Sequence, residues 1–480
     1  MDLRYPHLSS TNSSVIACRC RLPTRSQHNP NALRLRIFQV PIASLMIVWL
    51  LSCPARPLRA ATVDGVPQPL SLAQAEDLLR QYSTSLQTAR LAVDAAAADS
   101  VTAGEAPNPE FSFNASQIDY RRGIGSGPPW DKQVDSVLRI DQIFERGGKR
   151  ALRRQAAAAA ERATNSDLAD MWRIERLALA YAYYDLKLAE DAERVSSTLL
   201  GLQTQSLAAA QLRLKDGDVA AVDVGRLEIE VARSKADVSA ARNARRTAQL
   251  VLSQTMGVAP LAIFTAVDDW PSPPDNVDEN ITRMDATVDN HLDNRPDVQA
   301  AAARNQQAEA ELALARSQRK RDITIGLQYE RLPDPPNNNI NTVGVGFSFP
   351  LFLRHRYEGE IQRAAADRRT AAEMLRAVRL TAESDRTRAA ADLAGAIDRV
   401  RQFQNGIVDK AKTTAESAEY AYAHGALDLA DLLDARRTLQ SISLDAIAAR
   451  AAYAKASAAW RAAGDFGAVD TDLPLEKSKP

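Results

Sequence analysis

The stretch Tyr422-Ala-His-Gly-Ala-Leu-Asp-Leu-Ala-Asp-Leu-Leu-Asp-Ala435 interrupts a long region that otherwise favours helix. Gly425 can adopt the left-handed conformation that ends a helix, and the residues after it favour a new helix. Aspartates follow at Asp428, Asp431 and Asp434, a spacing that places them on neighbouring positions of one helical face. The stretch therefore predicts a hairpin of two helices with carboxylates close to its tip.

The same turn occurs earlier in the chain, in Leu214-Lys-Asp-Gly-Asp-Val-Ala-Ala-Val-Asp-Val-Gly225. Gly217 corresponds to Gly425, and Asp223 corresponds to Asp431. A chain that carries one turn twice indicates an internal duplication. We therefore expect two repeats with the same order of elements.

Each half also contains two segments in which apolar and polar residues alternate, the pattern of a half-buried strand. The first strand pair is predicted at 110–120 and 134–144, and the second at 322–331 and 342–350. A proline-free segment follows each pair, and the one from Arg150 to Leu214 would be on the order of 100 Å long as a single helix. Each half is predicted to run helix, strand, loop, strand, long helix, turn, helix.

The long helices are predicted to pack through coiled-coil seams, because their apolar residues recur in alternating steps of three and four. The seam residues are Leu177, Tyr181, Tyr184, Leu188, Val195, Leu199 and Leu202 in the first half and Leu393, Ile397, Val400 and Ile407 in the second. Shorter helices open the halves, one from Ser71 to about Ala103 and one from the motif Asn294-Arg-Pro-Asp-Val298 to about Arg319.

The duplication defines the predicted segments of the chain. They are an N-terminal extension with a signal peptide at 1–61, a first repeat at 70–257, a linker at 258–283, a second repeat at 284–464 and a loose charged tail at 465–480.

The N-terminal segment has the features of an export signal. A basic stretch precedes the apolar run Ile37–Leu51, which is short for a membrane-spanning helix and suits the apolar core of a signal. Leu50-Leu-Ser-Cys53 resembles a lipoprotein cleavage box, which would make Cys53 the lipidated first residue of the mature chain. The alternative is ordinary cleavage near Ala55 or Ala60, with Cys53 removed.

Composition argues against several classes of function. Lys plus Arg equals Asp plus Glu at 60 each, so the balance gives no electrostatic footprint for nucleic acid. The three cysteines all precede residue 54 and the five histidines lie far apart, which predicts no metal site. No His, Cys, Ser or paired carboxylates have a catalytic arrangement, so we expect neither a catalytic residue nor a cofactor, and not an enzyme.

The predicted strands have the length and alternation of a transmembrane β-barrel wall. Four strands cannot close a barrel, and an open edge in lipid leaves backbone groups unpaired. The strands therefore form either a small soluble sheet or part of a barrel shared by several chains; three chains would supply twelve strands. The long helices carry too many charges to span a bilayer, so they would project into an aqueous space as a tube.

This arrangement resembles the outer-membrane efflux protein family, the TolC-like channels. The resemblance rests on the two glycine turns and on three motifs, namely Ile143-Phe-Glu-Arg-Gly-Gly-Lys-Arg150, Asn294-Arg-Pro-Asp-Val298 and Phe349-Pro-Leu-Phe352. It implies a mainly α-helical fold with a small β part. In that fold, a homotrimer builds a twelve-stranded transmembrane β-barrel from four strands per chain, and long coiled-coil helices form an α-helical barrel.

The resemblance also implies a location and partners. The channel would lie in the cell outer membrane, in contact with its lipid, and extend into the periplasm. It would work with a periplasmic adaptor (membrane fusion protein) and an inner-membrane pump, and no nucleic acid is expected among its partners.

In TolC-like channels the periplasmic end is closed by inward-coiled helices. The resemblance implies ring aspartates at Asp431 and Asp434, a clamp tyrosine at Tyr422 and its partner at Asp223. Asp431 and Asp434 also suit a solvated helix start, where carboxylates favour the positive end of the helix dipole. Three copies of these aspartates around an axis would favour cations.

The resemblance further implies that the hairpin tips contact the partner proteins, through Gly217, Gly425, Leu427 and Asp428. Leu427 stands where the best-known member of the family has a clamping arginine. We therefore expect a gate at the same place with a different latch.

The implied function is a passive export duct of a tripartite efflux system. The element Glu145-Arg-Gly-Gly-Lys-Arg150 resembles the branch that serves cobalt–zinc–cadmium efflux, which makes heavy-metal cations the expected cargo. Multidrug efflux and type I protein secretion are rival cargo classes. A coiled-coil periplasmic adaptor or structural lipoprotein is the alternative from another class, but adaptors have one helical hairpin, whereas two are predicted here.

Overall fold

The computed structural model describes residues 69–118, 121, 125, 132–259, 264–274, 292–334 and 338–464. The chain divides into two units, Met1–Arg59 and Ala60–Pro480, and every described residue lies in the second. The predicted signal peptide, Cys53 and the predicted tail at 465–480 lie outside the described residues, as do 260–263 and 275–283 of the predicted linker.

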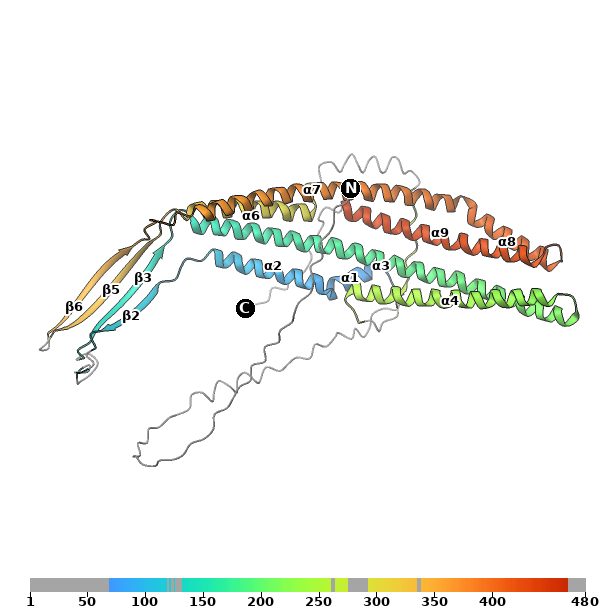
Figure 1. The fold of residues 1–480 in the computed structure, drawn as a ribbon, viewed down its shortest axis with the longest axis horizontal. Coiled ribbons are helices and arrows are strands. Elements are labelled where there is room, and N and C mark those ends of the chain that lie inside the picture. The colour runs from blue at the N-terminus through green and yellow to red at the C-terminus, as the bar shows by residue number, and fades with distance from the viewer. Residues whose placement is uncertain are drawn as a thin grey trace, which may run out of the picture. The chain divides into compact units, whose positions relative to one another are not determined.

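Long helices dominate the second unit (Figure 1). They are α1 (Leu72–Tyr82), α2 (Thr84–Ala103), α3 (Lys149–Asp216), α4 (Ala221–Met256), α6 (Pro296–Ser317), α7 (Glu358–Gln402), α8 (Val408–Ala423) and α9 (Leu429–Gly464). A 3₁₀ turn at Leu292–Asn294 precedes α6, and a π-helical turn at Phe403–Ile407 separates α7 from α8. Helix α3 packs along α2, α4, α6 and α9, and α7 packs along α6 and α9.

Helix α3 has 68 residues and is about 100 Å long at 1.5 Å per residue, in agreement with the predicted long helix. None of the helices in the described ranges has a stretch long and apolar enough to cross a membrane.

The helix predicted from Ser71 to about Ala103 is two helices. Ser71 begins α1 with a capping box: its hydroxyl accepts the N–H of Gln74 at 3.2 Å, and the Gln74 side chain accepts the N–H of Ser71 at 3.0 Å. Ser83 has an extended backbone, and its side chain accepts the N–H of Leu86 at 3.4 Å, which caps α2. The prediction of one helix was wrong because a second cap lies inside a helix-favouring sequence.

The two predicted strand pairs form one antiparallel sheet. Its strands are β2 (Glu110–Ser116), β3 (Asp135–Phe144), β5 (Ile323–Asp334) and β6 (Asn338–Ser348), in the order β2-β3-β5-β6. Pairing of β3 with β5 joins the first half of the chain to the second, with Phe144 opposite Ile323. The duplicated halves therefore share one sheet, and its outer strands β2 and β6 leave two open edges within the chain.

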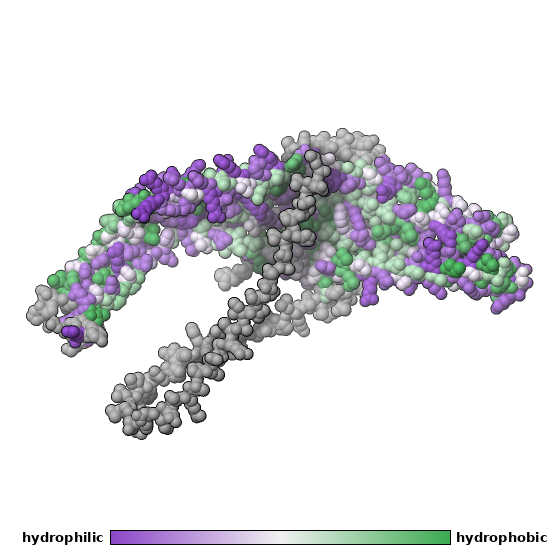
Figure 2. Space-filling model, viewed as in Figure 1, coloured by the Kyte–Doolittle hydropathy of each residue, from purple (hydrophilic) through white to green (hydrophobic). Residues whose placement is uncertain are grey.

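One face of this sheet is apolar. The register places Phe111 opposite Ile140, Ile140 opposite Leu327, and Leu327 opposite Val345, so apolar side chains form a continuous row across all four strands. These residues are exposed in the single chain, as is Phe347 at 68%. Hydrophobic residues are visible at the surface of the strands in Figure 2.

The opposite face of the sheet is polar. Arg139 and Asp141 on β3 form an ion pair there, with 2.7 Å between Nε of the arginine and Oδ2 of the aspartate. Gly326 on β5 lies beneath this pair, since a Cβ at that position would approach the Asp141 carboxylate to 2.3 Å.

The main core surrounds the middle of α3. Tyr183 and Leu186 are fully buried there, together with Phe264. The Tyr183 hydroxyl donates to the carbonyl of Leu70 at 3.0 Å and accepts the N–H of Asp268 at 3.2 Å.

The same core includes part of the predicted linker. Two short parallel strands, β1 (Pro69–Leu70) and β4 (Thr265–Ala266), bring the start of the first repeat against a segment within the predicted linker 258–283. The side chain of Gln249 on α4 donates to the carbonyl of Phe264 at 2.9 Å. This part of the linker is therefore packed structure.

The predicted seams are only partly correct. Tyr181 is exposed, whereas Tyr183, two residues later, is fully buried. Helix α3 contacts α1, α4, α9 and β4 around its middle, so the buried residues there do not follow a single coiled-coil stripe. In the second half Leu393, Ile397 and Val400 are buried as predicted.

The second seam ends early at a break in the helix. Ile407 is exposed, because non-helical backbone at Asn405 and Gly406 interrupts the helix just before it. Gly406 has φ 89°, so the helical periodicity does not continue through this point.

Arg295, in the motif Asn294-Arg-Pro-Asp-Val298, fixes α6 to α7. Pro296 occupies the first turn of α6, as predicted. Arg295 is only 1% exposed, and its guanidinium binds Asp297 at 2.8 Å and Asp385 on α7 at 3.1 Å. Burial by itself would lower the pKa of Arg295, but the hydrogen bonds and negative charges of Asp297 and Asp385 outweigh it and raise the pKa, which keeps the side chain charged.

Candidate functional site

The tips of the two hairpins lie at the end of the long helices remote from the sheet (Figure 1). Both turns close with the same backbone hydrogen bond. The N–H of Asp218 reaches the carbonyl of Arg213 at 2.9 Å, and the N–H of Ala426 reaches the carbonyl of Ala421 at 2.8 Å.

The residues before these donors, Gly217 and Gly425, have φ of 85° and 74°. This is the Schellman arrangement that ends a helix, and glycine adopts its left-handed backbone without steric cost. The duplication predicted from the sequence is thus repeated in the geometry of the turns.

A small apolar core joins the two tips. Its buried members come from α3, α4, α8 and α9 and are Ala210, Val224, Leu227, Ala418, Leu429, Leu432 and Leu433. Tyr422 and Leu427 pack against this core and are half-buried. Leu427, which stands at the position of the expected family arginine, therefore contributes apolar contact within its own chain.

The predicted ring aspartates lie on the exposed side of α9. Asp431 and Asp434 are both exposed, while Leu432 and Leu433 between them are buried in the tip core. Asp428 has a local role: its Oδ1 accepts the N–H of Asp431 at 2.9 Å and caps the start of α9.

Asp223 lies in the first turn of α4 and is half-buried. Its carboxylate is 3.7 Å from the guanidinium of Arg226, one helical turn away. The structure therefore gives Asp223 a partner on its own helix, and its predicted pairing with Tyr422 stays a prediction.

Two arginines that were not predicted from the sequence connect the hairpins. They lie on α9, farther from the turn than the aspartates. Arg436 on α9 is 6% exposed, and its guanidinium donates to Glu419 Oε1 on α8 and to Ser206 Oγ on α3, each at 2.9 Å. Arg437 pairs with Glu230 on α4, a glutamate that is 7% exposed. Charged groups this buried are stable only when paired, so the links hold the second hairpin against the first.

A signal for these links was present in the sequence. Two consecutive arginines follow the last aspartate of the row after a single alanine, in an otherwise alanine- and leucine-rich helix. Their partners could not be read from the sequence, because Ser206 and Glu230 lie in the other repeat, more than 200 residues away.

The tips contain one histidine, His424. It is exposed, and its ring lies over Tyr420 with 4.1 Å between ring centroids. In the part of the chain that the structure describes, no group of three or more His, Cys, Asp or Glu residues is placed to hold a metal ion.

The second repeat matches a known family. Residues 287–463 match the sequence model of the family described as outer membrane efflux protein.

Two full-length relatives and one solved structure are similar to most of the chain. The cobalt-zinc-cadmium resistance protein CzcC of Cupriavidus metallidurans is 22% identical over 374 residues, which are 77% of this chain and 84% of the relative. The pyoverdine export outer membrane protein OpmQ of Pseudomonas aeruginosa is 24% identical over 412 residues, 82% of this chain and 84% of that relative. The structure of the outer-membrane channel OprN superposes with a TM-score of 0.66 at 20% identity, covering 82% of this chain and 90% of that one.

These similarities agree with the architecture. The fold predicted from the sequence, long helices with four strands per chain in a TolC-like arrangement, is confirmed by the likeness to the OprN channel. The family match covers the second repeat, and the relatives extend the similarity over the first. The outer membrane efflux protein family is thus matched by residues 287–463, and most of the chain is similar in sequence to outer-membrane export proteins and in fold to an outer-membrane channel.

Proposed function

We propose that the chain forms a homotrimeric, passive export duct that crosses the outer membrane and extends through the periplasm. The observation that carries the proposal is the β2-β3-β5-β6 sheet, which has one continuous apolar face and two open edges. In lipid such edges must be paired, and the same sheet from three chains supplies twelve strands for a closed barrel. The apolar face then contacts lipid, and the polar face with Arg139 and Asp141 lines the interior.

The helices support the same assembly. Helices α3 and α4 form one hairpin, and α7 with α8 forms another with α9. The tips of both hairpins lie at the end of the helices remote from the sheet (Figure 1). Several large side chains on their surfaces are exposed in the single chain, among them Ile174, Tyr181 and Ile229. Packing of neighbouring chains in a tube would cover such residues.

The gate of this duct is proposed at the hairpin tips. Asp431 and Asp434 would line the opening, with Tyr422 and Asp223 close to it. The links from Arg436 and Arg437 to the first hairpin would act as the latch in place of an arginine at Leu427, because widening the tube there requires the two hairpins to separate.

The outermost turn residues are proposed to contact a periplasmic adaptor and, through it, an inner-membrane pump. These residues are Gly217, Gly425, Leu427 and Asp428. The turns are well suited to such contact, since Gly217 and Gly425 are exposed and lack side chains.

Heavy-metal cations are the proposed cargo. Support comes from the similarity to a cobalt-zinc-cadmium resistance protein over 77% of the chain and from the exposed aspartates at the tips. The pyoverdine exporter is similar to a comparable extent, so export of an organic compound is the rival. The Glu145–Arg150 element does not distinguish the two cargo classes. Its Lys149 is buried and paired with Asp322 at 2.8 Å, which is a structural role and not a contact with cargo.

Deletion of the gene tests this function. The deletion strain is expected to lose tolerance to cobalt, zinc and cadmium and to keep its tolerance to cationic dyes, and the unaltered gene should restore growth. As a control, the protein should be extracted from the outer membrane as a trimer that dissociates on heating. A soluble periplasmic monomer would refute the duct, whereas dye sensitivity without metal sensitivity would refute only the proposed cargo.

The aspartates predict the ion selectivity of the channel. The double variant Asp431→Ala/Asp434→Ala is expected to reduce the cation-to-anion permeability ratio about fivefold, since a unit charge at 4 Å contributes about 1 kcal/mol in water. Block by multivalent cations should weaken in parallel. The measurement is the reversal potential of reconstituted channels in a salt gradient.

A matched variant controls for net charge. Asp409→Ala/Asp445→Ala removes two exposed aspartates from α8 and α9 away from the turn, and its permeability ratio should stay close to that of the unaltered channel. Equal ratios for the two double variants would contradict the gate assignment.

A further inference from the structure

The connections between the sheet and the helices carry a concentrated positive charge. Three of them meet at this junction: the N–H of Arg146, after β3, binds Asp322, before β5, at 2.9 Å, and Arg319 donates to the carbonyl of Arg356, after β6, at 3.3 Å. We define the basic collar as the exposed residues Arg319, Lys320, Arg321, Arg354 and Arg356.

Little of the collar's charge is neutralised locally. Asp322 is already paired with Lys149, and Glu360 is 3.0 Å from His355. Glu358 is exposed at the start of α7, and Glu105 is exposed at the end of α2. Within the described residues, the side chains of Arg354 and Arg356 form no hydrogen bond or ion pair.

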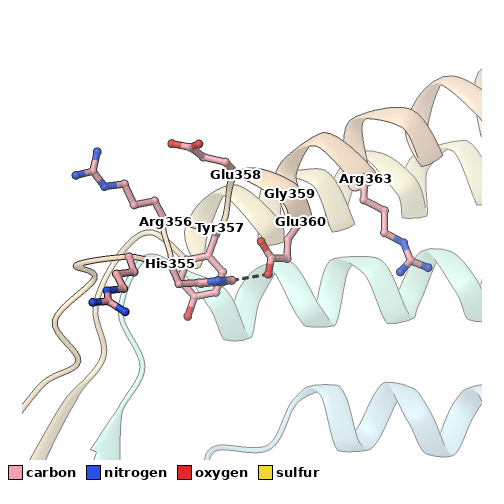
Figure 3. Close-up of a pocket in the computed structure, with 8 residues that line it drawn as sticks. His355, Arg356, Tyr357, Glu358, Gly359, Glu360 and Arg363 are labelled. Atoms are coloured by element: carbon pink, nitrogen blue, oxygen red, sulfur yellow. Dashed lines mark ion pairs between the residues drawn. The ribbon is translucent and has the colours of Figure 1, made fainter.

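The segment that carries Arg354 and Arg356 is held in place by aromatic contacts. Tyr357 immediately precedes α7 and has a left-handed backbone, φ 58°, and its ring meets the Phe352 ring edge-on with 5.4 Å between the ring centroids. The Arg321 guanidinium lies 5.5 Å from the centre of the Phe352 ring. Figure 3 shows the His355–Glu360 pair beside Tyr357, with the Arg356 side chain extending away from that pair.

Exposed apolar residues continue along the chain from the end of β6 up to this collar. Phe347, Phe349, Leu351 and Leu353 alternate along the chain from the end of β6, and all four are exposed, Leu353 by 77%. Arg354 follows immediately. In Figure 2 hydrophilic residues gather where the strands meet α6 and α7, with hydrophobic residues next to them.

An apolar band bordered by cations matches the boundary between acyl chains and phosphate headgroups. Long arginine side chains reach phosphates while neighbouring residues stay in the hydrocarbon. Exposed leucines next to the arginines suit a lipid surface, because a soluble anion has no apolar part to cover them.

We propose that the basic collar binds the phosphate headgroups of anionic phospholipids in the membrane leaflet that faces the helices. Arg354 and Arg356 are the principal ligands, and Leu351 and Leu353 contact the acyl chains. The inference rests on the proposed function, because it requires the sheet to lie in the membrane. It adds a class of lipid and a binding site for it, neither of which the duct itself requires.

The test measures lipid binding by the full chain. The protein is purified in non-ionic detergent, and dioleoyl-phosphatidylglycerol or dioleoyl-phosphatidylcholine is titrated while bound lipid is counted by native mass spectrometry. The unaltered protein should bind the anionic lipid more tightly. Arg354→Gln/Arg356→Gln should weaken that binding roughly 30-fold, since each arginine near an anionic surface contributes about 1 kcal/mol.

Two further variants separate charge from position. Arg368→Gln/Arg369→Gln removes the same charge from exposed positions farther along α7 and should leave binding unchanged. Leu351→Ser/Leu353→Ser should weaken binding of both lipids. The soluble headgroup glycerophosphoglycerol, added in excess, should displace little of the bound lipid.

Several outcomes would overturn the proposal. They are equal affinity for the two lipids, equal loss in the two arginine variants, or full displacement by the soluble headgroup. Migration of the trimer and channel conductance are measured on the same preparations, so that failure of the duct proposal can be distinguished from failure of the lipid site. Lipid preference in a protein that forms no trimeric channel would contradict the duct alone, and conducting trimers without lipid preference would contradict the lipid site alone.

Discussion

Channels carrying Arg436→Ser and Arg437→Ser are expected to stay open under conditions in which the unaltered channel is closed. Arg436 loses its hydrogen bonds to Glu419 and Ser206, and Arg437 loses its ion pair with Glu230. The buried Glu230 is then left without its cation, which favours movement of the hairpins that admits water to its carboxylate.

The size of the effect follows from the trimer. A hydrogen bond to a charged group contributes about 1.5–3 kcal/mol, so three copies of one link contribute about 5–9 kcal/mol. Converting a population that is 1% open into one that is 99% open takes about 5.5 kcal/mol. Arg437 is half exposed and screened by salt, so the contribution of its ion pair lies at the lower end of the range per link. Arg436 is buried and is not screened in this way.

Single-channel recording in planar bilayers measures this effect as open probability and conductance. The matched control is Arg242→Ser/Arg245→Ser, because both arginines bind Glu193 within the first hairpin, at 3.1 and 2.9 Å, and do not join the two hairpins. That variant should gate like the unaltered channel. The charge-swapped variant Arg437→Glu/Glu230→Arg, which keeps Arg436, should close like the unaltered channel. Equal open probabilities for Arg436→Ser/Arg437→Ser and Arg242→Ser/Arg245→Ser would refute the latch.

The second large effect concerns stability. Arg295→Ala is expected to cost about 3–5 kcal/mol, because removing one partner of a buried ion pair leaves uncompensated charge on Asp297 and Asp385. Arg295→Lys should recover only part of the loss, since an ammonium cannot reproduce the forked contacts of a guanidinium. The measurement is the temperature at which trimers dissociate, together with the amount of protein in the outer membrane.

A neighbouring pair serves as the control for Arg295. Arg379 on α7 binds Asp293 at 3.0 Å, but both side chains are more than half exposed. Arg379→Ala should therefore change stability by less than about 1 kcal/mol. If both variants dissociated at the same temperature, the assigned role of Arg295 would be wrong.

Local patterns in the sequence predicted the elements well. Alternation predicted both strand pairs, and the glycine turns predicted both hairpins, because a strand's pleat and a helix end depend on residues within a few positions of each other. Ser71, Pro296, Gly217 and Gly425 have the backbone roles expected from the sequence. The cap at Ser83 was missed because the sequence on both sides of it favours helix.

The candidate site was only partly predictable. The sequence indicated the tips and their aspartates, and the structure adds that Asp428 caps α9 and that Tyr422 and Leu427 pack on a shared core. The arginine links were not predicted. An arginine on a helix has many possible partners, and choosing among them requires knowing which helices lie side by side.

Whether a feature was determined by the sequence alone or only by the tertiary structure follows from the distance along the chain between the residues involved. Helices, strands and turns were already determined by neighbouring residues. Only the tertiary structure decided that β3 pairs with β5, that Tyr183 is buried while Tyr181 is exposed, and that Arg437 meets Glu230. Each of these depends on contacts between segments far apart in sequence, where the burial of charge and apolar surface selects one arrangement among many that the local patterns allow.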